Sequence, residues 1–199
     1  MTAANSRKAD HAIDPLFLNR WSPRAYSGET MPESDLLAIL EAAHWAPSAY
    51  NSQPWRFIYA LRDTPEWNKL FPILNDFNQS WAKDASALII IVSKSHFLAP
   101  GASEEGLSYS HSFDTGAAWG ALSLQAQLSG YQAHGMTGIH FDKAREILQL
   151  PEGYRVEAAA VVGRIGDKSK LPEFLQARET PSPRRPLSEV VFNGTFTSK

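Results

Sequence analysis

Residues 87–92 read Ala-Leu-Ile-Ile-Ile-Val, and this run is apolar on both of the faces that a strand would present. Successive side chains of a strand point to opposite faces of the sheet, so a strand of this kind is stable only where both faces are covered. We therefore predict a central β-strand here. Even extended back to Ala85, the run is far too short to span a bilayer, which requires about 20 apolar residues.

Signals for helix starts, helix ends and strands divide the rest of the chain. They predict helices at 14–19, from Pro32 to just before Pro47, and at 64–73, 110–128 and 142–150, the last of which is capped by Asp142. They also predict strands at 55–60 and 155–163 and a long surface loop at 96–108. This order indicates an α+β or α/β sandwich.

The two ends of the chain differ from its middle. We expect 1–13 to form a flexible extension and 14–199 a single domain, in which the proline-rich stretch from about 166 onward is an extended arm that embraces a second subunit. The helix at 110–128 is rich in Gly and Ala, which suits either a tightly packed core helix or a dimer-interface helix.

Composition excludes several classes of protein. The chain has no cysteine, which excludes a disulfide scaffold, a thiolate metal site and a Cys nucleophile. A net charge of −2 and a pI near 6.3 give no field that attracts nucleic acid or an anionic membrane, although a local patch can still bind one phosphate. The polar N-terminal stretch lacks the apolar core of a secretory signal, so we expect a cytoplasmic protein.

Arginine and serine alternate in Arg20-Trp21-Ser22-Pro23-Arg24. In an extended segment the side chains at 20, 22 and 24 share one face. Guanidinium groups suit phosphate because they donate two parallel hydrogen bonds to its oxygens. Taken alone, the segment favours a solvated basic turn over a phosphate site.

Two further segments carry polar groups of the same kind. The loop Pro47-Ser48-Ala49-Tyr50-Asn51-Ser52-Gln53-Pro54 sets amides and hydroxyls between two prolines, which suits either an ordinary turn or a stiff recognition loop. Arg184-Arg185-Pro186 suits either an exposed basic tail or a phosphate contact.

Together these segments resemble the FMN-dependent nitroreductase family, over about residues 15–191. By that resemblance Arg20 meets the FMN phosphate, Ser22 the pyrimidine edge and Arg24 the N1–C2 region, where a cation stabilises the reduced flavin. Asn78 matches a residue on the ribityl chain or the ring, and Arg184 or Arg185 a basic residue on the phosphate. The resemblance implies three further groups of cofactor contacts. Trp21 stands where a basic residue or His is common, and the backbone of Met136, Thr137 and Gly138 would lie beside flavin N5 and O4. The other subunit would contribute Pro47, Ser48, Ala49, Asn51 and Gln53.

The resemblance also implies a fold. It predicts an α+β, three-layer α-β-α sandwich with a mixed, mostly antiparallel sheet, in which 166–199 packs on the partner of an intertwined homodimer. FMN would then lie at the subunit interface, and 96–111 would form a variable lid.

The implied activity is hydride transfer from NAD(P)H to bound FMN, and from there to a small nitroaromatic, quinone or enone by a ping-pong mechanism. Tyr50, Tyr109 and Phe113 are the predicted substrate contacts. The alternative is a flavin-binding protein without reductase turnover. The chain shows no Gly-x-Gly-x-x-Gly for a separate dinucleotide site, no Gly-x-Ser-x-Gly around Ser48 for a hydrolase, and no histidine–carboxylate spacing typical of a metal site.

Overall fold

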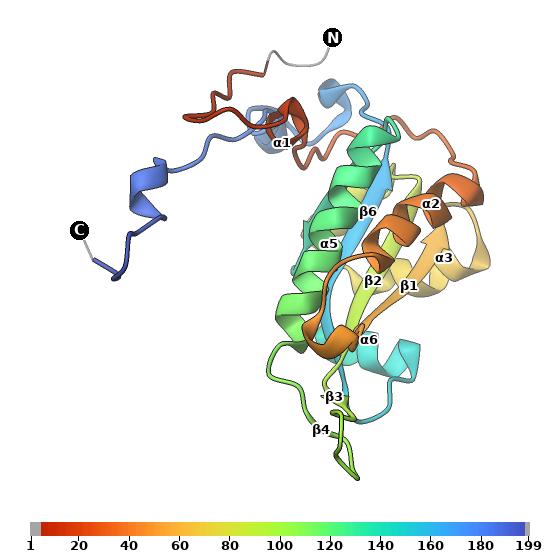
Figure 1. Ribbon diagram of the computed structural model, residues 1–199. Helices are drawn as coiled ribbons and strands as arrows, with labels where there is room; N and C mark the ends of the chain where they lie inside the picture. The colour runs from red at the N-terminus through yellow and green to blue at the C-terminus, as the bar shows by residue number, and fades with distance from the viewer. Residues whose placement is uncertain (1–4, 198–199) are drawn as a thin grey trace.

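A computed structural model describes residues 5–197, and it forms three layers (Figure 1). The strands are β1 (Trp55–Leu61), β2 (Ala87–Lys94), β3 (His96–Phe97), β4 (Gly106–Leu107), β5 (Gln132–Met136) and β6 (Tyr154–Gly163). The α-helices are α1 (Pro15–Asn19), α2 (Glu33–His44), α3 (Pro65–Leu70), α4 (Asp76–Ala82), α5 (His111–Leu128), α6 (Phe141–Leu148) and α7 (Glu173–Gln176). Short 3₁₀ turns lie at Ala49–Asn51, Phe71–Ile73, Lys168–Lys170 and Leu187–Glu189.

The main sheet has the order β1-β2-β6-β5, and every pairing among the described residues is antiparallel. The predicted central strand is confirmed as β2, which lies between β1 and β6 and is buried from Ala87 to Ser93. Its side chains alternate between two cores. Leu88, Ile90 and Val92 pack with α3, α4 and α6, whereas Ala87, Ile89 and Ile91 pack under α2 and α5.

Four features differ from the sequence-based expectations. Helix α4 and the edge strand β5 were not predicted, because α4 is short and β5 contains Gly135 and two polar residues. The predicted loop at 96–108 contains a small hairpin of β3 and β4. The prediction that Asp142 caps α6 is wrong: His140 holds the cap position, and Asp142 lies within the first turn, where a negative charge favours the helix dipole.

The two ends of the sheet carry different segments. The N-terminal segment and the C-terminal arm lie at one end, and the β3–β4 hairpin lies at the other (Figure 1). The first part of the arm packs on its own chain, because Leu171 and Leu175 are buried in the α3–α4–α6 core. Between residues 5 and 197, no helix is long and apolar enough to cross a membrane.

Candidate flavin site

A cavity of about 590 Å³ lies between helix α5, strands β2, β5 and β6, and the segment that follows α1. This volume falls within the range of about 300–1,000 Å³ that small-molecule sites occupy. Its lining residues are Arg20, Ser22, Ile91, Ser112, Thr115, Gly116, Trp119, Ser123, Gly135, Met136, Thr137, Glu157 and Ala158. Two of the predicted segments, at 20–22 and 136–137, therefore meet on one cavity although they lie more than a hundred residues apart.

The arginine side of the cavity begins where α1 ends. Arg20 caps that helix in an extended conformation, and its guanidinium Nη1 lies 3.4 Å from Ser22 Oγ, to which it donates. Burial, followed by the charge on Arg184, lowers the pKa of Arg20. A guanidinium remains protonated at neutral pH even so, which leaves a half-buried positive charge at the cavity wall.

Arg24, the third member of the motif, does not line this cavity. Its guanidinium lies 5.8 Å from the centre of the Trp81 ring, and its Nε is buried without a hydrogen-bond partner among residues 5–197. The backbone is held by the buried carboxylate of Glu179, whose Oε1 accepts from Arg24 N at 2.7 Å and from Ala25 N at 2.8 Å. Glu179 was not identified from the sequence, where it reads as one charge in a polar stretch.

The turn after β5 forms the opposite wall. Asn78 is buried on α4, and its Nδ2 donates to the carbonyl oxygen of Gly138 at 2.9 Å, so its amide nitrogen supports this turn. A Cβ at Gly138 would lie 2.5 Å from that nitrogen and 2.8 Å from Asn75 Nδ2. Glycine at 138 is thus required by the asparagines behind the turn, and Thr137 in front of it is exposed.

His134 supports the arginine segment from β5. Its Nδ1 lies 2.8 Å from the carbonyl oxygen of Pro23, and its ring centre lies 4.6 Å from that of Trp81. Burial, with smaller contributions from the charges on Arg24 and Arg20, lowers the pKa of His134 to about 4. The imidazole is therefore neutral at pH 7, and its proton on Nδ1 is donated to Pro23.

A further group on the cavity wall is Glu157, which the sequence analysis did not select. The pairing of β2 with β6 shifts between Ile91 and Val92, so that Glu157 is the extra residue of a β-bulge. A bulge redirects a side chain. Glu157 Oε1 accepts from Ser93 Oγ at 2.6 Å and from Ser112 Oγ at 2.7 Å. The sequence signal that could have identified Glu157 is a carboxylate within the otherwise apolar predicted strand at 155–163.

The Glu157 cluster does not have the geometry of a hydrolase triad. Ser93 Oγ and Glu157 Oε1 both approach the same nitrogen of His111, Nδ1, at 2.7 and 3.6 Å. In a triad the histidine uses one nitrogen for the nucleophile and the other for the acid. Ser48, the other serine considered, accepts through Oγ from Gln53 N at 3.0 Å and closes a turn.

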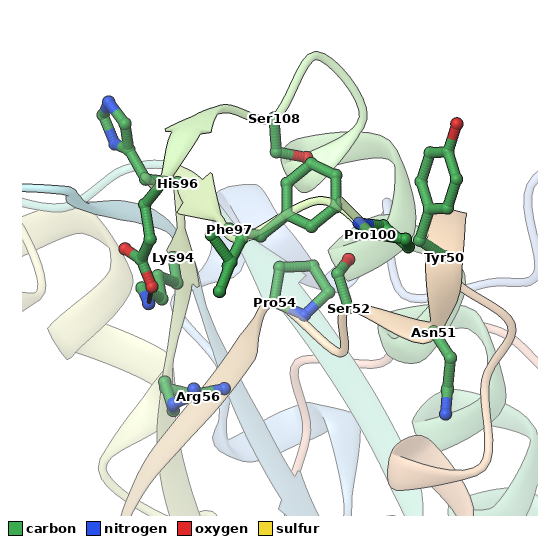
Figure 2. A pocket seen from close by; sticks show the side chains of 12 residues that line it. Tyr50, Asn51, Ser52, Pro54, Arg56, Lys94, His96, Phe97, Pro100 and Ser108 are labelled. Carbon is green, nitrogen blue, oxygen red and sulfur yellow. Dashed lines mark hydrogen bonds and ion pairs between the residues drawn. The ribbon is translucent and has the colours of Figure 1, made fainter. Parts of the chain in front are cut away.

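The predicted recognition loop lies away from the Arg20 cavity of its own chain. Its members Tyr50, Asn51 and Ser52 line a smaller pocket of about 330 Å³ with Lys94, Phe97 and the β3–β4 hairpin. Figure 2 shows these side chains around that pocket. Ala49 N donates to Asp114 Oδ2 at 3.1 Å, which attaches the loop to the start of α5. Tyr50, Asn51 and Gln53 have positive φ angles of 54°, 53° and 47°, a conformation that costs energy for residues other than glycine.

The remaining predicted residues do not line the Arg20 cavity. Trp21 is half-buried and Pro47 is exposed. Of the predicted substrate contacts, Tyr50 stacks on Phe97 with 5.8 Å between ring centres, whereas Tyr109 and Phe113 are fully and 82% exposed and line neither cavity. Arg184 and Arg185 are exposed on the C-terminal arm.

Comparison with known proteins identifies the family. The family model described as the nitroreductase family matches residues 18–76. The crystal structure of an oxidoreductase containing FMN is 51% identical over all of both chains, with a TM-score of 0.94. An NADH dehydrogenase of Thermus thermophilus is 26% identical over 87% of this chain and 92% of its own length, and the major NAD(P)H-flavin oxidoreductase of Aliivibrio fischeri is 32% identical over 42% of this chain and 40% of its own.

A relative that is 51% identical over its full length, together with the family match, defines the class of the protein. The chain belongs to the nitroreductase family.

Proposed function

We propose that the protein is an FMN-dependent oxidoreductase that takes hydride from NAD(P)H and passes it to a small electron-poor acceptor. The observation that carries the proposal is the convergence of Arg20, Ser22 and the 136–137 turn on one cavity of ligand size. The full-length relative described as containing FMN supports the choice of cofactor, and the NADH dehydrogenase of Thermus thermophilus supports the choice of donor.

The residues present fit FMN on chemical grounds. Arg20 offers a half-buried guanidinium that no carboxylate among the described residues pairs with, as a phosphate requires. Arg24, two residues beyond Ser22, does not line this cavity, and its guanidinium adds positive charge to the same segment. Ser22 and the backbone of Met136, Thr137 and Gly138 offer further polar contacts. When bound, FMN supplies the hydride chemistry, and no nucleophilic side chain is needed.

The chain's own residues orient the cofactor and set its electrostatics. Glu179 and His134 hold the Arg20–Arg24 segment through its backbone, and Asn78 holds the turn after β5. Two unit charges about 4 Å apart attract by roughly 4 kcal/mol at an effective dielectric of 20, so a cation of this segment near the flavin would stabilise its reduced form. Since 1.4 kcal/mol corresponds to about 30 mV for a two-electron couple, an interaction of this size would raise the reduction potential of the flavin.

We further infer that the functional unit is a homodimer. The loop at 47–53 lies on a different cavity from Arg20 within one chain, so Ser48 and Asn51 can serve a flavin only from a second subunit. One open face of the flavin would bind NAD(P)H and the electron acceptor in turn. This order of binding requires ping-pong kinetics with nitroaromatic, quinone or enone acceptors.

The decisive experiment is an anaerobic absorbance spectrum of the purified protein before and after NADH or NADPH. A flavin spectrum that bleaches with the donor and returns when a quinone or nitroaromatic is added supports the proposal, and parallel double-reciprocal plots support the ping-pong mechanism. A flavin that stays oxidised supports the alternative of flavin binding without turnover. A colourless protein that FMN cannot reconstitute contradicts both.

Replacing Arg20 tests the phosphate assignment. Arg20→Ala is expected to weaken FMN binding by about 1.5–3 kcal/mol, the range for a lost hydrogen bond to a charged group. Titration followed by flavin fluorescence measures the change, and Lys143→Ala, on the exposed side of α6, is the matched control. FMN affinity equal to that of the wild type would remove Arg20 from the site.

A further inference from the structure

Arg7 is the single half-buried residue in the stretch from 5 to 15, where all other described residues are exposed. Its Nε donates to the carbonyl oxygen of Ser182 at 2.8 Å. Its Nη1 donates to the carbonyl oxygens of Leu18 at 3.0 Å and Arg20 at 2.7 Å. One side chain therefore joins the N-terminal segment, the end of α1 and the C-terminal arm.

These contacts gather positive charge beside the Arg20 cavity: Arg7 and Arg184 line an adjoining pocket of about 640 Å³ between the N-terminal segment and the C-terminal arm, whereas Arg20 lines the flavin cavity. Arg184 Nη1 lies 3.5 Å from the same Ser182 carbonyl oxygen that Arg7 uses. Burial, followed by the charges on Arg184 and Arg20, lowers the pKa of Arg7. None of these three arginines forms an ion pair with a carboxylate within residues 5–197. Three like charges held together in this way are stabilised by an anion.

Arg7 retains donors for such an anion. A guanidinium has five N–H groups. The hydrogen bonds that the described residues supply use the Nε–H and the two hydrogens of Nη1, which leaves both hydrogens of Nη2. Phosphate oxygens are well suited to guanidinium donors because the bonds are charge-assisted.

Resting on the proposed function, we propose that Arg7 is a third guanidinium of the FMN phosphate site, with Arg20 and Arg184, and that it fastens the C-terminal arm to this site. Arg7 fixes the backbone at Arg20 and at Ser182, and thereby holds the other two arginines around one anion. The N-terminal segment is then part of the cofactor site, and Arg184 rather than Arg185 is the phosphate contact on the arm.

The test compares FMN with riboflavin, which lacks the phosphate. In Arg7→Ala the ratio of the riboflavin Kd to the FMN Kd is expected to fall at least fivefold, because FMN binding weakens while riboflavin binding changes less than twofold. Hydrogen exchange of the 181–191 segment, measured without flavin, is expected to become faster because the Ser182 anchor is lost. Arg7→Lys is expected to recover part of the FMN preference, since it restores charge without the fork of donors.

Lys8→Ala is the matched control, because Lys8 carries the same charge one residue away and is exposed. A wild-type Kd ratio in Arg7→Ala, or an equal loss of affinity for FMN and riboflavin, would overturn the role of Arg7 while leaving the proposed function intact. Wild-type protein that binds neither flavin would overturn the proposed function itself, and the phosphate role with it.

Discussion

Glu179 acts at the scale of a single residue, because one carboxylate oxygen accepts from two consecutive backbone N–H groups at Arg24 and Ala25. Glu179 is 4% exposed, so its removal leaves two buried donors without an acceptor. Each unsatisfied buried donor costs about 1–3 kcal/mol. We expect Glu179→Ala to lower the free energy of unfolding by about 2–4 kcal/mol, measured by urea denaturation.

Two variants control for this prediction. Glu179→Gln keeps an oxygen acceptor and is expected to lose less stability than Glu179→Ala. Glu152→Ala removes an exposed carboxylate and is expected to change little. If Glu179→Ala unfolds at the same urea concentration as Glu152→Ala, the two hydrogen bonds do not support the arginine segment.

His134 makes stability depend on pH. Its pKa is about 4 in the folded protein and about 6.5 for a histidine exposed to water, so the unfolded state binds more protons between these values. Stability therefore rises with pH across this window and is lost as the pH falls from 6.5 towards 4. At about 1.4 kcal/mol per pKa unit, the free energy of unfolding that is lost between neutral pH and full protonation of His134 is at most about 3.5 kcal/mol.

The measurement is urea unfolding at several pH values between 4 and 7, compared between wild type and His134→Asn. The difference between the two proteins is expected to change with pH, whereas the exposed His11→Asn should follow the wild type. A difference that is constant from pH 4 to pH 7 would show that His134 is not held in its neutral form.

At the scale of elements, α5 approaches β5 closely at Gly135. A Cβ at this glycine would lie 2.8 Å from Cζ2 of Trp119, and both residues line the Arg20 cavity. We expect Gly135→Ala to lower the free energy of unfolding by about 1–3 kcal/mol, as overpacking does, and to weaken FMN binding because the indole is pushed into the cavity. Thermal unfolding and flavin titration together measure both effects.

The matched control is Gly106→Ala on the β3–β4 hairpin, where an added Cβ meets no atom within 4 Å in its own chain. Because Gly106 has open space beside it and no positive φ angle, this variant should be about as stable as the wild type. Equal stability of Gly135→Ala and Gly106→Ala would contradict the close approach of Trp119 to β5.

At the scale of the whole molecule, the exposed surface of α5 is a candidate contact between two subunits of a homodimer. Phe113 and Leu128 are 82% and 65% exposed on this helix, and Gly120 has open space beside it. Small residues let a second helix approach closely, which favours the dimer-interface interpretation of this helix. We expect sedimentation analysis to give a mass near twice 22.0 kDa.

Gly120→Trp is expected to shift the protein to monomer and to lower FMN affinity, because the flavin site would lose the 47–53 loop of the second subunit. Gly106→Trp, on the exposed β3–β4 hairpin, is the control of equal bulk. A wild-type protein that is monomeric and binds FMN at one site per chain would contradict the shared site.

The sequence by itself determined the central strand, the long helix and the Arg20–Ser22 motif, because apolar patterning and local residue chemistry act over a few neighbouring residues. Only the tertiary structure decided that Arg20 meets the 136–137 turn, that a β-bulge brings Glu157 to the same cavity, and that Glu179 and Arg7 hold the arginine segment. Each of these depends on contacts between distant parts of the chain, so no local pattern predicts them. The short α4 and the polar edge strand β5 escaped prediction for the same reason, since packing rather than intrinsic preference stabilises them.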